Sequence, residues 1–517
     1  MIGAGPNGLV AANLLADRGW DVVVLEAAPE PGGAVRSGEL TLPGFTHDLF
    51  SAFYPLAAAS PVIRGLELER WGLEWRHAPA VLAHPLEDGR AALLSTDVEE
   101  TAASLDAIAP GDGNAWKELY ALWRRTGDAV IAAITQPLVP AVPALRLAGA
   151  LRTGIPSFVR FGLLSATRLA DEHFRGPGGG EIVAGNALHT DLSPTMSPSG
   201  FYGWLLASLG QHVGWPVPAG GAGRLTGAMA SRLRARGGEV VCGTRVTRIE
   251  VRGGRAVAAL TADGDAHAAR KAVIATTGAP ALFGELLDPA DVPPRVRDRM
   301  ERFEYDHATV KVDWALDAAI PWAAPDVRRS AAVHVGGSMD EMVRYASQID
   351  LGMVPDRPFL VLGQMNVADP SRSPAGTETV WAYTHVPQRP ARPVASWEDV
   401  VDGMEAQIER FASGFRSRIK ARHVFTPETM EATNANLVGG AVNGGSAKLH
   451  QQLFFRPAPG LARGKTPIKG LYLGSASVHP GGGVHGAPGA NAARAALAAE
   501  RRASFAALAK KPQRPSA

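Results

Sequence analysis

The 517-residue chain contains a single cysteine, Cys242. One cysteine excludes an internal disulfide and any metal site or iron–sulfur cluster built from several thiolates, and it fits a reducing compartment. We therefore expect a cytoplasmic protein. The signatures H-E-x-x-H, G-x-S-x-G and C-x-x-C are also missing. The sequence thus offers no metal site and no activated serine or cysteine.

Neither sign of charge dominates, and no long hydrophobic run occurs. The 52 Lys and Arg residues against 50 Asp and Glu give a formal net charge of +2. No basic run stands out, so we expect no nucleic-acid partner. The longest uncharged stretch, "AVIAAITQPLVPAVPAL" from Ala129 to Leu145, is shorter than the roughly 20 residues of a membrane-spanning helix. Its prolines would also break a helix, and we predict no transmembrane segment.

What the chain does contain begins at its first residues, "MIGAGPNGLVAANLLADRGWDVVVLEAAPEPGGAVRS". Gly3, Gly5 and Gly8 precede a helical pattern, and Glu26 ends the strand "WDVVVLE". In such a βαβ fingerprint the glycines let a pyrophosphate approach the helix N-terminus, and the acid accepts hydrogen bonds from ribose hydroxyls. Only Met1 and Ile2 precede Gly3, whereas a strand usually has about 5 residues. We expect either a shortened first strand or a start that lies a few residues too late.

A second glycine pair follows the acid in "PEPGGAVRS", with Arg36 just beyond it. Domains that bind only NAD do not need this pair. It resembles the glycine pair of FAD enzymes of the glutathione-reductase and amine-oxidase type, in which backbone and an arginine approach the phosphates. The sequence therefore predicts FAD. The candidate contacts are Gly3, Gly5, Pro6, Asn7, Gly8, Glu26, Ala27, Gly32, Gly33, Ala34, Val35 and Arg36.

Near the C-terminus the chain reads "HPGGGVHGAPGANAARAAL" from His479 to Leu497. Three consecutive glycines precede an alanine-rich helical pattern. Glycine lets a chain approach a ligand closely, and a helix N-terminus offers free N–H groups and a partial positive charge. This segment predicts contact with a flat, electron-rich ligand.

Together, the N-terminal fingerprint, "PGGAVRS" and "TPIKGLYLGSASVHPGGGVHGAPGANAA" resemble the phytoene-desaturase-like FAD oxidoreductases, in the wider flavin amine oxidase and carotenoid desaturase superfamily. The closest resemblance is to the branch of pyridine nucleotide-disulfide oxidoreductase domain-containing proteins. It implies non-covalent FAD, with the flavin ring beside Gly483 and the Val484 amide. Further contacts are implied at Gly474 and Ser475, and adenine is implied against the backbone of Val246. Ser475 departs from the family, which often has glycine there.

The fold implied is α/β, with a discontinuous Rossmann-type FAD-binding domain and an inserted α+β substrate-binding domain. The predicted FAD-binding parts are residues 1–95, 220–300 and 457–503, and the predicted substrate-domain parts are 96–219 and 301–456. Residues 504–517 are predicted to be a disordered tail. The sequence gives no indication of the oligomeric state.

Two side chains are candidates for catalysis. The segment "DHATVKVDWALDAAIPW" alternates like a strand and puts Thr309, Lys311 and Asp313 on one face. A lysine in mid-strand can simply face solvent. The resemblance instead implies the amine-oxidase lysine that holds a water against the flavin, which falls on Lys311. His485 follows the flavin-facing glycines and could face the substrate, while His189 in "GNALHTDLSP" is a weaker candidate.

The leading hypothesis is an FAD-dependent oxidoreductase that desaturates, saturates or isomerises C–C bonds of an apolar, polyene or isoprenoid-like substrate. The alternatives are a flavin amine or amino-acid oxidase, and a flavin-containing protein that binds its ligand without turnover. Gly483 stands where a cage tyrosine of the amine oxidases would fall, which favours the first; the other interpretation of Gly483 is that it only permits a turn. No second G-x-G-x-x-G directly follows a predicted strand, so the electron acceptor is oxygen, a quinone or the product itself.

The first insertion repeats arginine among leucine and phenylalanine in "ALRLAGALRTGIPSFVRFGLLSATRLADEHF". One interpretation is core-packed helices with solvated arginines. The other is a lipid-facing entrance for a greasy substrate, with peripheral membrane contact.

Overall fold

The structure is a computed structural model that describes residues 1–138 and 141–509. Its nucleotide-binding half is built on a parallel sheet in the order β8, β1, Ile2, β12, β18. Ile2 forms parallel bridges to Leu25 on one side and Ala275 on the other, so a single buried residue takes the central place in the sheet. The strands are β1 (Val23–Leu25), β8 (Glu239–Val241), β12 (Val273–Ala275) and β18 (Leu471–Leu473).

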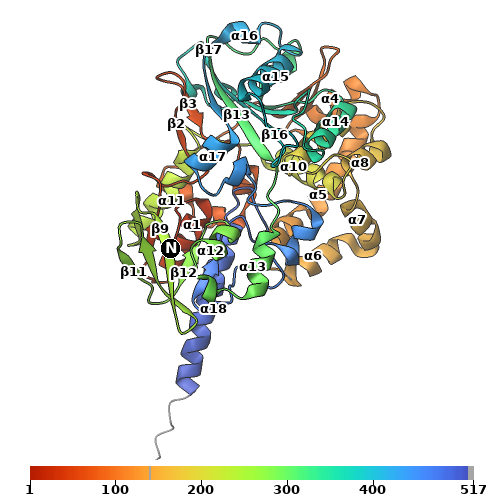
Figure 1. Ribbon diagram of the computed structural model, residues 1–517. Coiled ribbons are helices and arrows are strands. Elements are labelled where there is room, and N and C mark those ends of the chain that lie inside the picture. Colours follow the sequence, from red (N-terminus) through yellow and green to blue (C-terminus); the bar gives the residue numbers. More distant parts are fainter. Residues whose placement is uncertain (139–140, 510–517) are drawn as a thin grey trace, which may run out of the picture.

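Three helices pack beside this sheet in one buried apolar cluster. They are α1 (Pro6–Ala16), α11 (Gly223–Ala235) and α18 (Ala487–Ala509). The first and last of them lie against each other although they come from opposite ends of the chain (Figure 1). A three-stranded antiparallel sheet packs on the other side, formed by β9 (Val246–Arg252), β10 (Arg255–Thr261) and β11 (Ala266–Ala268), and two short helices follow it, α12 (Ala279–Gly284) and α13 (Pro294–Glu301).

The other half is built on a seven-stranded sheet in the order β17, β13, β16, β15, β14, β5, β6. All neighbouring pairs are antiparallel except β14 with β5. The strands are β5 (Ala80–Pro85), β6 (Ala91–Leu94), β13 (Ala308–Leu316), β14 (Ser330–Val335), β15 (Leu360–Gln364), β16 (Glu378–Val386) and β17 (Ile419–Phe425). Alternate residues of these strands contribute to two different apolar clusters, so both faces of the sheet are covered.

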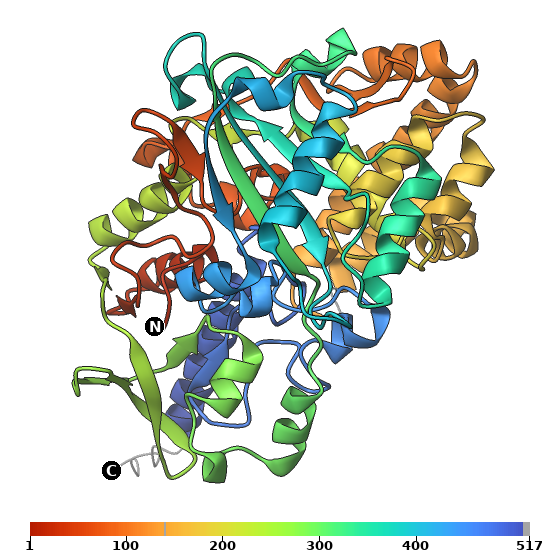
Figure 2. The ribbon, with the colours of Figure 1, turned by 45° about the horizontal axis from the view of Figure 1, so that its top comes forward.

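Helices from the first insertion gather beside this sheet (Figure 2, orange to yellow). They are α4 (Val98–Ile108), α5 (Asp112–Thr135), α6 (Ala141–Leu151), α7 (Ile155–Gly162), α8 (Ala166–His173), α9 (Gly179–Leu188) and α10 (Ser199–Val213), with α14 (Met339–Asp350) added from the second insertion. The opposite face packs against α15 (Trp397–Glu409) and α16 (Phe415–Arg418), and α17 (Pro427–Thr433) follows β17. Smaller elements are β2 (Ser37–Glu39), β3 (Thr46–Asp48), β4 (Trp75–Arg76), β7 (Val217–Pro218), α2 (Pro55–Ala59) and α3 (Pro61–Arg64).

The α/β fold class with an inserted α+β unit is confirmed, and two assignments along the chain differ. Strands β5 and β6 fall within 1–95, yet they pair into the seven-stranded sheet because β5 runs beside β14. The last helix, α18, continues to Ala509, so residues 504–509 of the expected tail are helical and 510–517 lie outside the described residues. Within the described ranges, no helix is long and apolar enough to cross a membrane.

Candidate flavin and substrate site

The N-terminus of α1 is built to receive an anion. Gly3 has φ +93°, and a Cβ on Gly8 would fall 2.1 Å from the Gly3 carbonyl oxygen, so this turn needs both glycines. Pro6 opens the helix, no acidic residue lies in its first turn, and no side chain caps it. The N–H groups of Gly5, Asn7 and Gly8 make no hydrogen bond within the described chain. These donors and the helix dipole fit a pyrophosphate.

Glu26 lies beside this turn, at the end of β1. One carboxylate oxygen accepts a hydrogen bond from the Ala4 N–H at 2.6 Å, and the other accepts from the Ala28 N–H at 2.9 Å. A carboxylate has about four acceptor positions, so Glu26 fixes the loop and keeps capacity for ribose hydroxyls. Ala27 beside it is exposed, as an adenosine contact requires.

The second glycine pair packs on the first turn. A Cβ on Gly33 (φ +57°) would fall 3.1 Å from the Gly5 Cα, so the two loops touch through bare backbone. Arg36 donates to the Gly33 carbonyl at 3.0 Å and to the Thr433 carbonyl at 3.3 Å. It thereby shapes the loop that contains Gly32, Ala34 and Val35, and it also lines a cavity of about 350 Å³ together with Arg224.

Val246 begins β9 and is half-buried. Next to it, the Thr244 N–H donates to the Glu26 carbonyl and the Gly243 N–H to the Ala28 carbonyl, both at 2.8 Å. The chain that leads into Val246 therefore runs beside the end of β1, which carries Glu26. Val246 thus lies beside Glu26, where a residue that contacts adenine is expected to lie.

The C-terminal glycine turn is held in a conformation that few residues other than glycine adopt. Gly481 has φ +116° and Gly483 has φ +114°, and a Cβ on Gly483 would fall 2.6 Å from Leu56 Cδ1. The turn itself therefore requires Gly483. This supports the interpretation that Gly483 only permits a turn. Leu56 belongs to α2, so the turn also touches the hydrophobic core of the other half.

Val484, the next residue, has φ +50°, which is uncommon for a branched side chain. Its N–H makes no hydrogen bond among the described residues. A strained residue that presents a free amide just before α18 fits the predicted contact with the pyrimidine edge of the flavin.

Gly474 and Ser475 lie at the end of β18. A Cβ on Gly474 would fall 3.3 Å from the Gly489 Cα and 3.2 Å from the Ala492 Cβ, so Gly474 allows α18 to approach the sheet. The Ser475 hydroxyl accepts from the Ser477 N–H at 3.3 Å. Contact of either residue with the cofactor stays a prediction.

His485 does not have a free ring nitrogen, contrary to the catalytic role expected for it. Its Nδ1 accepts from the Ala487 N–H at 3.1 Å, and its Nε2 lies 3.1 Å from the Gly482 carbonyl oxygen, to which it donates. Burial lowers the pKa of His485 to about 4. We assign His485 a structural role, because the neutral ring joins the glycine turn to the start of α18.

A buried arginine supports the turn from behind, and sequence reasoning did not identify it. Arg456 is 1% exposed and donates to the backbone carbonyls of Asn443, Gly445, Ser446 and Ala476. A Cβ on Gly482 would meet the Asn443 backbone at 3.0 Å, so this loop backs the glycine turn directly. Nothing in the local sequence of "FFRPAPG" distinguishes such an arginine from a solvated one.

Lys311 is buried in the middle of β13 and forms an ion pair. Its Nζ lies 2.5 Å from both carboxylate oxygens of Asp313, and its side chain is 2% exposed. Burial raises the pKa of Asp313, but Lys311 and His47 lower it more, and the net shift is downward. Lys311 and Asp313 share a face of the strand, as expected. Lys311 does not face solvent, because the pair is enclosed.

Four aromatic side chains lie next to this ion pair and contact one another. We call them the aromatic wall: Phe53, Trp215, Trp381 and Tyr383. Phe53 lies 5.8 Å from Trp215 and 5.7 Å from Trp381 between ring centroids, and Trp381 stacks on Tyr383 at 6.1 Å. Lys311 Nζ lies 5.9 Å from the Trp381 ring.

The aromatic wall connects to the glycine turn, because Phe53 and Leu56 pack in one cluster with Trp381 and Tyr383. Sequence reasoning missed it. The alternation in "TVWAYTHV", which puts Trp381, Tyr383 and His385 on one face of β16, was the available signal. Trp215 and Phe53 come from other segments, so no local pattern predicts that they meet there.

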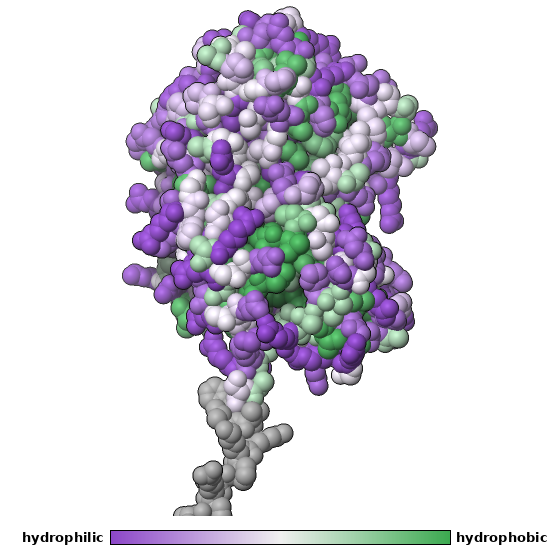
Figure 3. Space-filling view, turned by 90° about the vertical axis from the view of Figure 1, so that its left-hand side faces the viewer, coloured by the Kyte–Doolittle hydropathy of each residue, from purple (hydrophilic) through white to green (hydrophobic). Residues whose placement is uncertain are grey.

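The surface is hollowed at mid-height when the molecule is seen from the left side of Figure 1, and hydrophobic residues gather around the hollow (Figure 3). Hydrophilic residues are spread over much of the remaining face. Among the described residues no cluster of three or more His, Cys, Asp or Glu side chains could hold a metal ion.

Comparison with known proteins agrees with this geometry. The family model described as "Flavin containing amine oxidoreductase" matches residues 7–312. The match begins in the first glycine turn and ends one residue after Lys311.

Curated relatives match almost the whole chain. Pyridine nucleotide-disulfide oxidoreductase domain-containing protein 2 of Rattus norvegicus is 26% identical over 95% of this chain and 92% of its own length. A limonene dehydrogenase chain of Castellaniella defragrans is 25% identical over 96% of this chain and 93% of its own. The lycopene-forming phytoene desaturase of Pseudescherichia vulneris is 25% identical over 97% and 98%.

A solved structure has the same fold. The oxidoreductase from Methanosarcina mazei superimposes with a TM-score of 0.61 at 16% identity, covering 96% of this chain and 99% of that one.

Proposed function

Because the chain belongs to the flavin-containing amine oxidoreductase family, we propose that it is an FAD-dependent oxidoreductase acting on a carbon–carbon bond of an apolar, polyene-like or isoprenoid-like substrate. Relatives whose names state oxidation of limonene or desaturation of phytoene align over nearly the full chain. FAD would supply the hydride acceptor or donor, held by the two glycine loops, Glu26 and the turn at Val484.

The observation that carries the proposal is the aromatic wall, which packs in one cluster with Leu56, the residue beside Gly483 of the glycine turn. Gly481, Gly482 and Gly483 project no side chains, and the rings of Trp381 and Tyr383 are nearly parallel, 4° apart. Trp381 is fixed in place, because its indole covers Gly363 and its Nε1–H donates to Met365 Sδ at 3.1 Å. A flat, hydrophobic wall favours a conjugated or aliphatic chain, whose binding gains about 25 cal/mol for each Å² of apolar surface buried.

The protein's own contribution is orientation, water exclusion and one buried ion pair. The aromatic wall excludes water beside the reacting bond, which strengthens electrostatic interactions there. Asp313 balances the charge of Lys311 in the buried site. The pair can hold a water or stabilise negative charge on the reduced cofactor, so we keep Lys311 as the proposed catalytic residue.

We propose that the protein is cytoplasmic and that it takes up its apolar substrate at a membrane surface, which it contacts through α6 and α7. Five large apolar side chains of this segment are 41–73% exposed: Val142, Leu145, Ile155, Val159 and Leu163. No acidic residue occurs between Asp128 and Asp171, while Arg146 and Arg152 are exposed. Apolar side chains with unbalanced positive charge favour an anionic phospholipid surface.

A cavity of about 440 Å³ lies at the base of this face, lined by Leu138, Ala141 and Val142 together with Arg463, Lys465 and Arg494. The proposed membrane contact is tested by sedimentation with vesicles containing anionic phospholipid. The Leu145→Ser/Val159→Ser variant should lose binding, and Leu351→Ser, a control at a 70% exposed leucine in another part of the surface, should not. Equal binding of all three proteins would contradict the proposal.

The reaction is tested by mixing the FAD-loaded protein anaerobically with limonene, phytoene in vesicles, or a panel of primary amines. The loss of visible flavin absorbance is recorded. We expect reduction by an apolar olefin. Reduction by amines alone would establish the amine-oxidase alternative, which the family name favours. A flavin that none of these donors reduces, in a protein that still binds phytoene, would support the ligand-binding alternative.

A further inference from the structure

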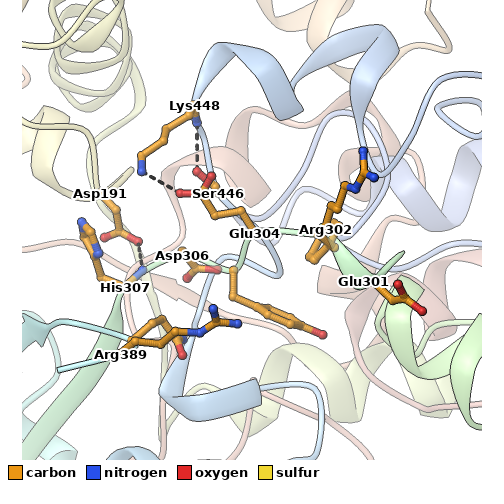
Figure 4. A pocket seen from close by; sticks show the side chains of 12 residues that line it. Asp191, Glu301, Arg302, Glu304, Asp306, His307, Arg389, Ser446 and Lys448 are labelled. Atoms are coloured by element: carbon orange, nitrogen blue, oxygen red, sulfur yellow. Dashed lines mark hydrogen bonds and ion pairs between the residues drawn. The ribbon is translucent and has the colours of Figure 1, made fainter. Parts of the chain in front are cut away.

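A polar cavity, separate from the two described above, lies at the edge of the seven-stranded sheet, where the chain enters β13 (Figure 4). It has a volume of about 430 Å³ and is lined mainly by polar and charged side chains. Two of its lining residues, Asp191 and His307, are joined by a hydrogen bond from the His307 N–H to Asp191 Oδ2 at 3.1 Å. The flavin and substrate site described above does not use this cavity.

Asp191 connects the cavity to a deeper residue. Its other oxygen, Oδ1, lies 2.9 Å from His385 Nε2, and the two side chains are 6% and 4% exposed. Asp191 has φ +63°, in the left-handed region that Asp and Asn adopt more readily than most residues, shortly after α9. The structure therefore pairs a buried carboxylate with a buried imidazole next to the polar cavity.

His385 in turn reaches the face of the sheet that carries Lys311. Thr309 Oγ1 lies 3.2 Å from His385 Nδ1, and the two residues are direct partners in the pairing of β13 with β16. Thr309 precedes Lys311 by two residues, so both point to the same side of β13. Tyr383 of the aromatic wall lies 5.3 Å from the His385 ring. Three side chains from three elements thus form a continuous line from the cavity to the wall.

We propose that Asp191, His385 and Thr309 form a proton relay between the polar cavity and the substrate site. This inference rests on the proposed function, because converting a CH–CH bond to C=C removes one hydride and one proton. FAD, when bound, would accept the hydride, and the proton needs a route to water. Saturation requires the same proton in the opposite direction.

The step balances with the groups present. Thr309 Oγ accepts the substrate proton while its own hydroxyl proton passes to His385 Nδ1. The resulting imidazolium gives its Nε2 proton to Asp191, and water in the cavity removes it. No oxidant or reductant other than the flavin reaction is needed. The two transfers between protein groups follow the 3.2 Å contact of Thr309 Oγ1 with His385 Nδ1 and the 2.9 Å ion-pair contact of His385 Nε2 with Asp191 Oδ1.

Electrostatics favour His385 over the neighbouring histidines for this role. Burial lowers the pKa of His385, but Asp191 raises it more, and the net shift is upward. Burial lowers the pKa of His189 to about 3 and that of His334 well below its usual value, so both stay neutral. The titratable groups that face His385 are Asp191, His189, Asp306, His307, Tyr345 and Tyr383.

The first test compares Thr309→Val, which removes only the hydroxyl, with Thr309→Ser, which restores it. Limonene is the probe, and the rate of anaerobic flavin reduction is measured in H₂O and D₂O. We expect about a 100-fold loss in Thr309→Val, the scale of general acid–base catalysis, and recovery of most of the rate in Thr309→Ser. His385→Ala should regain rate on addition of imidazole, which the adjoining cavity can admit. Equal rates and isotope effects in all variants would overturn the relay.

The second test does not depend on an olefin substrate. Re-oxidation of chemically reduced enzyme by oxygen consumes a proton, and Thr309→Val should slow this step too. In ¹⁵N-histidine-labelled protein, His385 should show an Nε2-bound proton whose signal moves in Asp191→Asn, a substitution that keeps the shape and tolerates positive φ. If Thr309→Val slows re-oxidation although limonene is not oxidised, the relay is retained and the proposed substrate class is rejected. An Nε2 without a proton, with unchanged re-oxidation, would remove the relay itself.

Discussion

Gly489 of α18 lies against the backbone of Asn7 in α1 so closely that a Cβ on it would fall 1.9 Å from the Asn7 carbonyl oxygen. The two helices come from opposite ends of the chain, and their N-termini flank the cofactor site. This contact therefore fixes the distance between the turn that is predicted to bind pyrophosphate and the turn that is predicted to contact the flavin. A backbone oxygen cannot move aside as a flexible side chain can.

We predict that Gly489→Ala destabilises the protein by about 1–3 kcal/mol or more, the usual cost of overpacking. The measurement is the free energy of unfolding in denaturant, together with the affinity for FAD. Gly403→Ala is the matched control, because its helical site has no atom within 4 Å of the new Cβ and alanine favours a helix. A Gly489→Ala protein as stable as wild type would show that the helices can separate freely.

Glu26 provides the second prediction. Its carboxylate accepts from the Ala4 and Ala28 N–H groups, so Glu26→Ala should lower both stability and FAD affinity. Glu26→Gln keeps an acceptor oxygen, and should mainly weaken FAD binding by about 1.5–3 kcal/mol, the range for hydrogen bonds to a charged group. Titration of the apoprotein with FAD, alongside thermal unfolding without FAD, separates the two effects. Unchanged FAD affinity in both variants would make Glu26 a purely structural residue.

The Lys311–Asp313 pair requires a double variant. Lys311→Met alone leaves a buried carboxylate without its partner and should cost about 3–5 kcal/mol of stability. Lys311→Met/Asp313→Asn removes both charges and should regain most of that stability while still slowing flavin reduction or re-oxidation. Stopped-flow measurement of both half-reactions checks this. Wild-type rates in the double variant would return Lys311 to a structural role.

Glu378 gives the protein a pH dependence that is independent of the cofactor. Burial raises the pKa of Glu378 to about 7, although the Asn366 N–H donates to it at 2.8 Å. The folded state then holds a proton that the unfolded chain has lost, so stability falls as the pH rises from the unfolded pKa of about 4.3 to the folded value. Across this pH range the wild-type protein should lose on the order of 3 kcal/mol in its free energy of unfolding, and Glu378→Gln should not show this loss. Parallel stability–pH curves for the two proteins would contradict the shift.

Local patterns predict the parts of the site that act through backbone. The spacing of Gly3, Gly5 and Gly8 specifies a turn, and the turn forms because only glycine fits so close to its own chain. Strand alternation likewise predicts that Lys311 and Asp313 share a face, as they do.

Side-chain partners from distant segments are not predictable in this way. Asp191 and His385 belong to different insertions, and only the packing of α9 against the sheet brings them together. The sequence near His485 gave no sign that both ring nitrogens bind backbone. The single-residue central strand at Ile2 also depends on its neighbours, which supply pairing on both sides.

The central claim, oxidation or reduction of an apolar carbon–carbon bond beside the aromatic wall, is tested most directly by product analysis. FAD-loaded protein and its Trp381→Ala variant are incubated with phytoene in vesicles, and the extracted hydrocarbons are examined by mass spectrometry as flavin absorbance is followed. The account predicts loss of hydrogen from the hydrocarbon in step with flavin reduction, and a strong decrease of both in Trp381→Ala. Unchanged phytoene beside a flavin that primary amines reduce, at equal rates in both proteins, would contradict it.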